Sequence, residues 1–191
     1  MKRHSVLLIV LMMSIPALGQ APIDGAFGLK LGAILDVDSD GVEVVGGFED
    51  AVYRVDPPKP LSGFQDYFVY VTPISHTIYQ IKAFRYFGLK VHAEEEYSFL
   101  QEVLRKKYAI EERTSKSIRD KRFAPTGNGG YYEQGGNTIR IESHAGRNVS
   151  GIDRIVTDVA RPRVVLNYRS KDVKLRKEEF MELHRRQEGD G

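Results

Sequence analysis

The residues with the clearest chemical spacing are Asp36, Asp38 and Asp40, which precede Gly41 in the pattern D-x-D-x-D-G. Alternate aspartates supply the hard oxygen ligands that Ca²⁺ prefers, and a glycine permits the sharp turn of a calcium loop. Such a loop ends on a bidentate glutamate at its twelfth position, which is Gly47 in this chain. The missing ligand favours an Asx-type turn between two short strands. A calcium site at Asp36, Asp38 and Asp40 remains the alternative.

The histidines offer no recognisable catalytic or zinc pattern. None of His76, His92, His144 and His184 lies four residues from another, the spacing of a helical zinc site. Ser75 and Ser143 each precede a histidine, but neighbours on a strand point to opposite faces and do not form a nucleophile and base. The sequence therefore assigns no catalytic residue and no cofactor other than the calcium alternative.

Tyr67, Tyr70 and Tyr79 lie in a segment that is rich in aromatic residues. Tyrosine combines an apolar ring with a polar hydroxyl and is common at binding surfaces. We interpret these three tyrosines as a candidate surface for an envelope protein or a glycan, with a purely structural core as the alternative.

Hydrophobic periodicity predicts the strands and helices on which these residues lie. Strands are predicted at 67–71 and 77–84, joined by a turn at 73–76, with Tyr79, Ile81 and Ala83 on one face. Two further pairs are predicted, 131–134 with 138–142 around the glycines at 135 and 136, and 152–159 with 163–168.

Two helices complete the prediction. Residues 93–110 have apolar side chains at helical spacing, with glutamates at 94–96 near the start and Arg105, Lys106 and Lys107 near the end, which suits the helix dipole. A C-terminal helix is predicted at 175–186, with Glu178 and Glu179 on its surface. Runs of strands beside isolated helices predict an α+β fold with an antiparallel sheet built from hairpins.

The first nineteen residues have the three parts of a secretory signal peptide. Lys2 and Arg3 precede an apolar run at 6–15, and Ala17 and Gly19 provide small residues for cleavage after Gly19. The run is shorter than the roughly 20 residues that span a bilayer. We expect residues 20–191 to form one domain, periplasmic or secreted, with no membrane span after cleavage.

Charge and cysteine content exclude several classes of protein. The chain has 28 basic and 26 acidic residues, and loss of Lys2 and Arg3 leaves 26 of each. A nucleic-acid-binding domain usually has a basic excess, so nucleic acid is not an expected partner. The absence of cysteine excludes disulfides and thiol catalysis.

Four short motifs resemble small exported proteins of unknown function from Gram-negative bacteria. They are FGLKLG at 27–32, PPKP at 57–60, YVTP at 70–73 and IYQI at 78–81. The resemblance implies a periplasmic location and carries no functional residues.

The leading functional hypothesis is a non-enzymatic binding or inhibitory module. It depends on the expected export, the aromatic hairpin and the lack of a catalytic pattern. The alternatives are a cell-envelope hydrolase with an unrecognised active site and a calcium-stabilised structural module.

Overall fold

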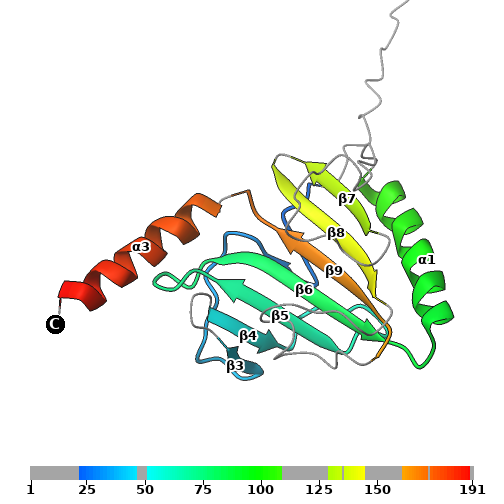
Figure 1. The fold of residues 1–191 in the computed structure, drawn as a ribbon, viewed down its shortest axis with the longest axis horizontal. Coiled ribbons are helices and arrows are strands. Elements are labelled where there is room, and N and C mark those ends of the chain that lie inside the picture. The colour runs from blue at the N-terminus through cyan, green and yellow to red at the C-terminus, as the bar shows by residue number, and fades with distance from the viewer. Residues whose placement is uncertain are drawn as a thin grey trace, which may run out of the picture.

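The computed structural model describes residues 22–46, 51–108, 129–134, 136–144, 161–171 and 173–189. Its centre is a seven-stranded sheet in the order β3-β4-β5-β6-β9-β8-β7, and every neighbouring pair is antiparallel. These strands are β3 (Val42–Gly46), β4 (Ala51–Val55), β5 (Asp66–Val71), β6 (Ile78–Tyr86), β7 (Gly129–Gln134), β8 (Asn137–His144) and β9 (Arg163–Arg169). The helices are α1 (Lys90–Tyr108) and α3 (Val173–Gly189), and β1 (Gly25–Ala26) pairs with β2 (Leu29–Lys30). The α+β prediction is confirmed (Figure 1).

The two local hairpins are also confirmed. β5 pairs with β6 across the turn at 73–75, and β7 pairs with β8 in a register that places Gln134 opposite Asn137. β9 lies between β6 and β8, so the last strand joins the two hairpins into one sheet. The strand predicted at 152–159 and the signal peptide predicted at 1–19 lie outside the described residues.

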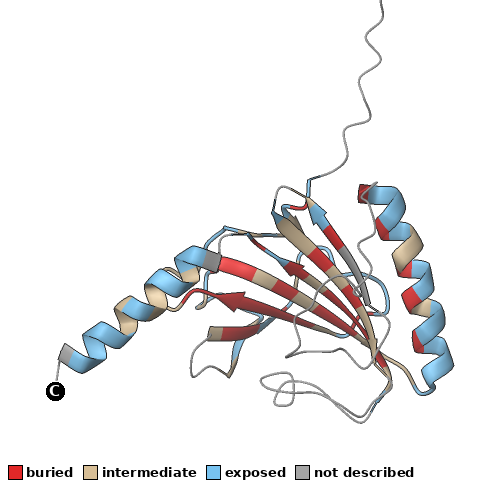
Figure 2. Cartoon of the chain, turned by 45° about the horizontal axis from the view of Figure 1, so that its top comes forward, coloured by how far each residue is buried: buried red, intermediate tan, exposed pale blue. Residues whose placement is uncertain are grey.

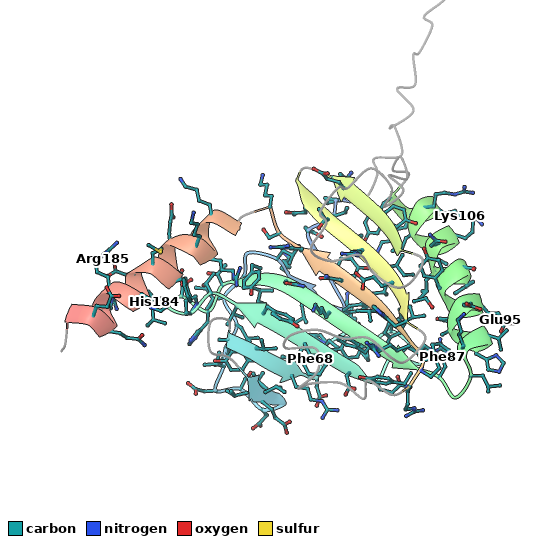
Figure 3. The ribbon with its side chains drawn as sticks, viewed as in Figure 1. Phe68, Phe87, Glu95, Lys106, His184 and Arg185 are labelled. Carbon is teal, nitrogen blue, oxygen red and sulfur yellow. The ribbon has the colours of Figure 1, made fainter. Side chains whose placement is uncertain are left out.

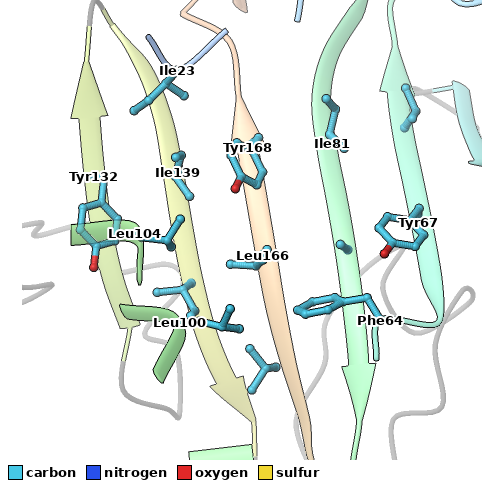
Figure 4. Packing of buried hydrophobic residues seen from close by; sticks show 14 of the residues in the cluster. Ile23, Phe64, Tyr67, Ile81, Leu100, Leu104, Tyr132, Ile139, Leu166 and Tyr168 are labelled. Carbon is cyan, nitrogen blue, oxygen red and sulfur yellow. The ribbon is translucent and has the colours of Figure 1, made fainter. Parts of the chain in front are cut away.

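Helix α1 covers one face of the sheet over β8 and β9. Its buried residues are Ala93, Tyr97, Leu100, Leu104 and Tyr108, which recur at helical spacing. Leu100 and Leu104 lie against the strands in the same cluster as Ile139 and Tyr132 (Figure 4). Arg85 of β6 also binds Glu96 of α1, with 2.7 Å between Nη1 and Oε1. Figure 2 shows the resulting contrast between the buried and exposed sides of α1.

The N-terminal segment 22–35 packs on the same face. Ile23 is buried, and the Asn137 side chain donates a hydrogen bond to its carbonyl at 2.6 Å. The Phe27 ring packs edge-on against Tyr67 and Tyr168, at centroid distances of 5.1 and 5.7 Å. Burial raises the pKa of Tyr168, and the neighbouring Tyr108 raises it further, so this hydroxyl stays neutral.

The opposite face of the sheet carries a second buried cluster. It consists of Val52, Phe68, Tyr70, Tyr79, Phe84 and Val165. The expectation that Tyr79 shares a face with Ile81 and Ala83 is wrong, because those two residues belong to the first cluster. The register between β5 and β6 shifts at Tyr70 and Val71, and this bulge reverses the face on which Tyr79 lies.

Helix α3 follows β9 and projects beyond the ends of the strands, on the side of the β5–β6 turn (Figure 1). Among the described residues, no helix combines the length and apolar character needed to cross a bilayer.

Candidate functional site

The first half of α3 is attached to the β5–β6 turn through the Glu179 carboxylate. Its Oε1 atom accepts a hydrogen bond from the Ser75 hydroxyl at 2.6 Å, and Oε2 accepts bonds from the Ile74 and Ser75 amides, both at 2.9 Å. The Ser75 hydroxyl also lies 2.8 Å from the Thr72 hydroxyl and 2.7 Å from that of Thr77. One carboxylate therefore joins the helix to a chain of three hydroxyl groups.

The hydrogen bonds determine the ionisation of Glu179. Burial alone would raise the pKa of this carboxyl, but the bonds from Ser75, Ile74 and Thr72 outweigh burial and hold the pKa below its ordinary range. Glu179 is therefore ionised at neutral pH. Arg176, one turn earlier on α3, lies over the Tyr79 ring at 5.3 Å from its centroid. The two side chains place α3 beside the hairpin.

A pocket of about 350 Å³ lies between α3 and this end of the sheet. Its walls come from the loop before β3, the β5–β6 turn, the end of β9 and the first turns of α3. The lining residues are Gly32, Thr72, Thr77, Ile78, Tyr79, Ser170, Lys174, Leu175 and Glu178.

Polar side chains are concentrated at this pocket. In the described part of the chain, Thr72, Arg163 and Ser170 are the buried polar or charged residues, and two of these three line the pocket. At its exposed side, Lys174 pairs with Glu178 at 3.4 Å, so the charges there are balanced. The pocket combines hydroxyl groups with apolar surface from Ile78 and Leu175.

A second polar group lies on the face of the sheet opposite α1. Glu142 Oε2 is 2.8 Å from His144 Nε2, and Glu142 Oε1 is 2.5 Å from Arg140 Nε. Burial would raise the pKa of Glu142, but the hydrogen bond to His144 and the charges of Arg140 and Lys82 hold it below the usual range. This ionised carboxylate orients His144, an arrangement that could support general-base chemistry.

The three aspartates of the calcium motif are placed in a turn. Asp36 Oδ1 accepts a bond from the Asp38 amide at 3.3 Å, and the Asp36 carbonyl accepts one from the Ser39 hydroxyl at 2.8 Å. Gly41 has a φ of 79°, as expected for a glycine that closes a turn. The described residues contain no group of three His, Cys, Asp or Glu side chains gathered as a metal site, so Asp36, Asp38 and Asp40 do not converge.

The candidate tyrosine surface is divided between two faces. Tyr67 packs in the cluster beneath α1 and the N-terminal segment, whereas Tyr70 and Tyr79 lie on the other face. All three are buried. The Tyr67 hydroxyl donates to the Leu61 carbonyl at 3.1 Å and accepts from its amide at 2.8 Å, and burial raises the pKa of Tyr67 despite these bonds.

The remaining histidines lie at separate positions. His92 is 3.2 Å from Glu95 on the exposed side of α1, the His76 ring is 6.4 Å from that of Tyr53, and His184 packs against Phe180 on α3.

Sequence reasoning treated Glu179 as a helix-surface residue and did not identify the pocket. Glu179 and Ser75 are 104 residues apart, and no local pattern relates them. One pattern in the sequence could have indicated which side of α3 faces the protein. Arg176, Glu179 and Leu183 share one side of a helix, which places two charged groups beside an apolar residue on the side that faces the protein.

The comparisons with known proteins found no relative. No protein-family model matches the chain, and no curated protein or solved structure matches it at a significant level.

Proposed function

We propose that the protein is exported and acts as a non-enzymatic binding protein, with a small saccharide of the cell envelope as its ligand in the pocket beside α3. The observation that carries the proposal is the placement of buried Thr72 and Ser170 in the wall of a cavity. Binding sites use a few polar groups placed among apolar side chains to orient a ligand.

The size and charge of the pocket support a small neutral ligand. A volume of about 350 Å³ lies at the lower end of the range of roughly 300–1,000 Å³ for ligand pockets. Because Lys174 and Glu178 balance each other, the pocket has no excess charge to select an ion. Hydroxyl groups of Thr72, Thr77 and Ser170 suit a ligand that has many hydroxyl groups, and Ile78 and Leu175 suit its C–H surface.

The export part of the proposal comes from the N-terminal sequence. A positively charged start, a short apolar run and small residues before position 20 are typical of a secretory signal. An exported protein would meet envelope glycans directly, so the location and the chemistry of the pocket agree.

The test is an NMR titration of the mature chain with N-acetylglucosamine and with glucose. We expect millimolar affinity and concerted shifts of the Gly32, Thr77 and Ser170 amides, because a small ligand makes few contacts. Leu175→Trp would fill the pocket and abolish the shifts, whereas Met181→Trp on the same helix would leave them unchanged. If neither sugar moves these amides, or if the shifts persist in Leu175→Trp, the saccharide proposal fails.

An inhibitory role would give a different result in affinity capture. One envelope protein retained in near-equal amount, and still retained by Leu175→Trp, would replace the saccharide with a protein partner at another surface.

A second candidate function, hydrolysis of envelope material, is favoured by the contact between His144 and the ionised Glu142. Its test is release of soluble fragments from purified envelope polymer by the wild type and by His144→Gln. Loss of release in His144→Gln, with an unchanged melting temperature, would support the enzyme. Equal release, or none from either protein, would exclude His144 as its base.

A further inference from the structure

The outer side of α1 exposes Phe99 and Val103, one helical turn apart, in addition to Val91 in its first turn. Phe99 is 63 % exposed and Val103 is 40 % exposed, whereas the adjacent Leu100 and Leu104 are each 5 % exposed. Single exposed apolar residues are ordinary on protein surfaces. Their significance here depends on the charges that flank them.

Those charges are ordered along the helix. Glu95 lies one turn before Phe99 with 69 % of its side chain exposed, and Lys106 lies about one turn after Val103 with 76 % exposed. Figure 3 shows Glu95 and Lys106 on the side of α1 away from the sheet, one in each half of the helix. The intervals of four, four and three residues place all four side chains on one stripe. The stripe is therefore acidic, then apolar, then basic.

The order of charges on α1 of one copy is complementary to that on α1 of a second copy that runs in the opposite direction. In an antiparallel pair of helices related by a twofold axis, Phe99 of one copy opposite Val103 of the other places Glu95 opposite Lys107, which lies one turn after Val103. Both apolar residues then meet at the centre, and opposite charges meet at both ends. A parallel pair would instead bring like charges together.

We propose that α1 is a self-association surface, through which two copies of this chain pair in antiparallel fashion around Phe99 and Val103. The occupant of the exposed stripe is a second copy, and the charge order along α1 supports this choice over an anionic or a cationic partner. The inference is independent of the pocket beside α3, which lies at the other end of the sheet (Figure 1).

The dimer should be weak. A helix of 19 residues is about 28 Å long. Two such helices alone bury less than the roughly 1,200–2,000 Å² of a stable interface. Glu102 also binds Arg105 and Lys106 within each chain, at 3.0 and 3.2 Å, and so competes for one of these basic side chains. The expected association therefore depends on concentration and weakens at high salt.

Sedimentation equilibrium of the mature chain, from micromolar to millimolar concentration at low and high salt, tests the proposal. The wild type should dimerise reversibly, and Phe99→Ser should weaken association by about tenfold or more. Met181→Ser is the matched control, because Met181 is 55 % exposed on α3 and lies off the stripe. Equal weakening by both substitutions, or a wild type that stays monomeric throughout, would overturn the proposal.

The charges give an independent test. Glu95→Lys should weaken the dimer, and adding Lys107→Glu to it should restore association at low salt. Failure of this rescue would contradict the antiparallel register. If the monomeric wild type binds phosphatidylglycerol vesicles and Phe99→Ser abolishes that binding, the stripe belongs to a membrane surface and the dimer is rejected.

Discussion

Glu179 accepts a hydrogen bond of 2.6 Å from the Ser75 hydroxyl, although the two residues are 104 positions apart in the chain. The same carboxylate accepts bonds from the amides of Ile74 and Ser75. Helix α3 projects beyond the ends of the strands (Figure 1), and these contacts join its first half to the β5–β6 turn. They also hold one wall of the pocket against the others.

Replacing Glu179 should loosen α3 without unfolding the sheet. Glu179→Gln removes the charge that strengthens three hydrogen bonds, at an expected local cost of about 1–2 kcal/mol after allowance for solvent. Hydrogen exchange of the Ile74 and Ser75 amides should therefore accelerate roughly five- to thirtyfold. Glu178→Gln is the control, since Glu178 pairs with Lys174 and does not bind these amides. Unchanged exchange in Glu179→Gln would show that the carboxylate does not hold the turn.

The same attachment should depend on pH. The hydrogen bonds hold the folded-state pKa of Glu179 below the unfolded value of about 4.3. Its contribution is therefore complete above about pH 5 and is lost as the pH falls through the folded-state pKa. Protection factors of the Ile74 and Ser75 amides should decrease over that acidic range, relative to amides at the centre of β6. A decrease between pH 6 and 8 instead would assign the effect to another group.

Glu142 should contribute to global stability. Its side chain is 17 % exposed and binds both Arg140 and His144, so Glu142→Gln leaves two basic groups without their carboxylate. We expect a loss of about 2 kcal/mol in the free energy of unfolding, measured by urea titration. Glu188→Gln at the exposed end of α3 should change stability by less than about 0.5 kcal/mol. Similar values for both variants would contradict the role of the Glu142 cluster.

Adjacent residues on α1 should differ strongly in their effect on stability. Leu104→Ala creates a cavity against the sheet and should cost about 2–4 kcal/mol. Val103→Ala removes a side chain that is 40 % exposed and should cost less than about 1 kcal/mol. Urea unfolding of both variants at a concentration where the protein is monomeric makes the comparison. A reversed order would mean that α1 packs through its other side.

Calcium should have no effect on the turn at 36–41. The Asp36, Asp38 and Asp40 carboxylates do not converge in this turn, so a cation would have to rearrange the loop to gain its ligands. We expect the same melting temperature in millimolar Ca²⁺ and in chelator, for the wild type and for Asp38→Asn. A calcium-dependent rise that Asp38→Asn abolishes would establish the site and the structural-module hypothesis.

Local interactions account for what could be predicted from the sequence. Alternating aromatic and β-branched residues specify β5 and β6, the glycines at 135 and 136 favour the β7–β8 hairpin, and helical spacing from Tyr97 to Tyr108 specifies α1. The placement of two of the three tyrosines on opposite faces of the sheet could also be predicted. Tyr67 and Tyr70 are three residues apart on one strand and must face opposite ways.

Long-range pairing decided the rest. The position of β9 between β6 and β8, the bulge that reverses Tyr79, and the contact of Glu179 with Ser75 all join segments that no local pattern relates. The elements, the buried side of α1 and the ordered charges along it could be predicted from the sequence, because helix and strand periodicity act within a few residues. The gathering of Thr72, Ser170 and Leu175 around one pocket could not be predicted in this way, because the free energy of bringing distant segments together depends on the packing of the whole sheet.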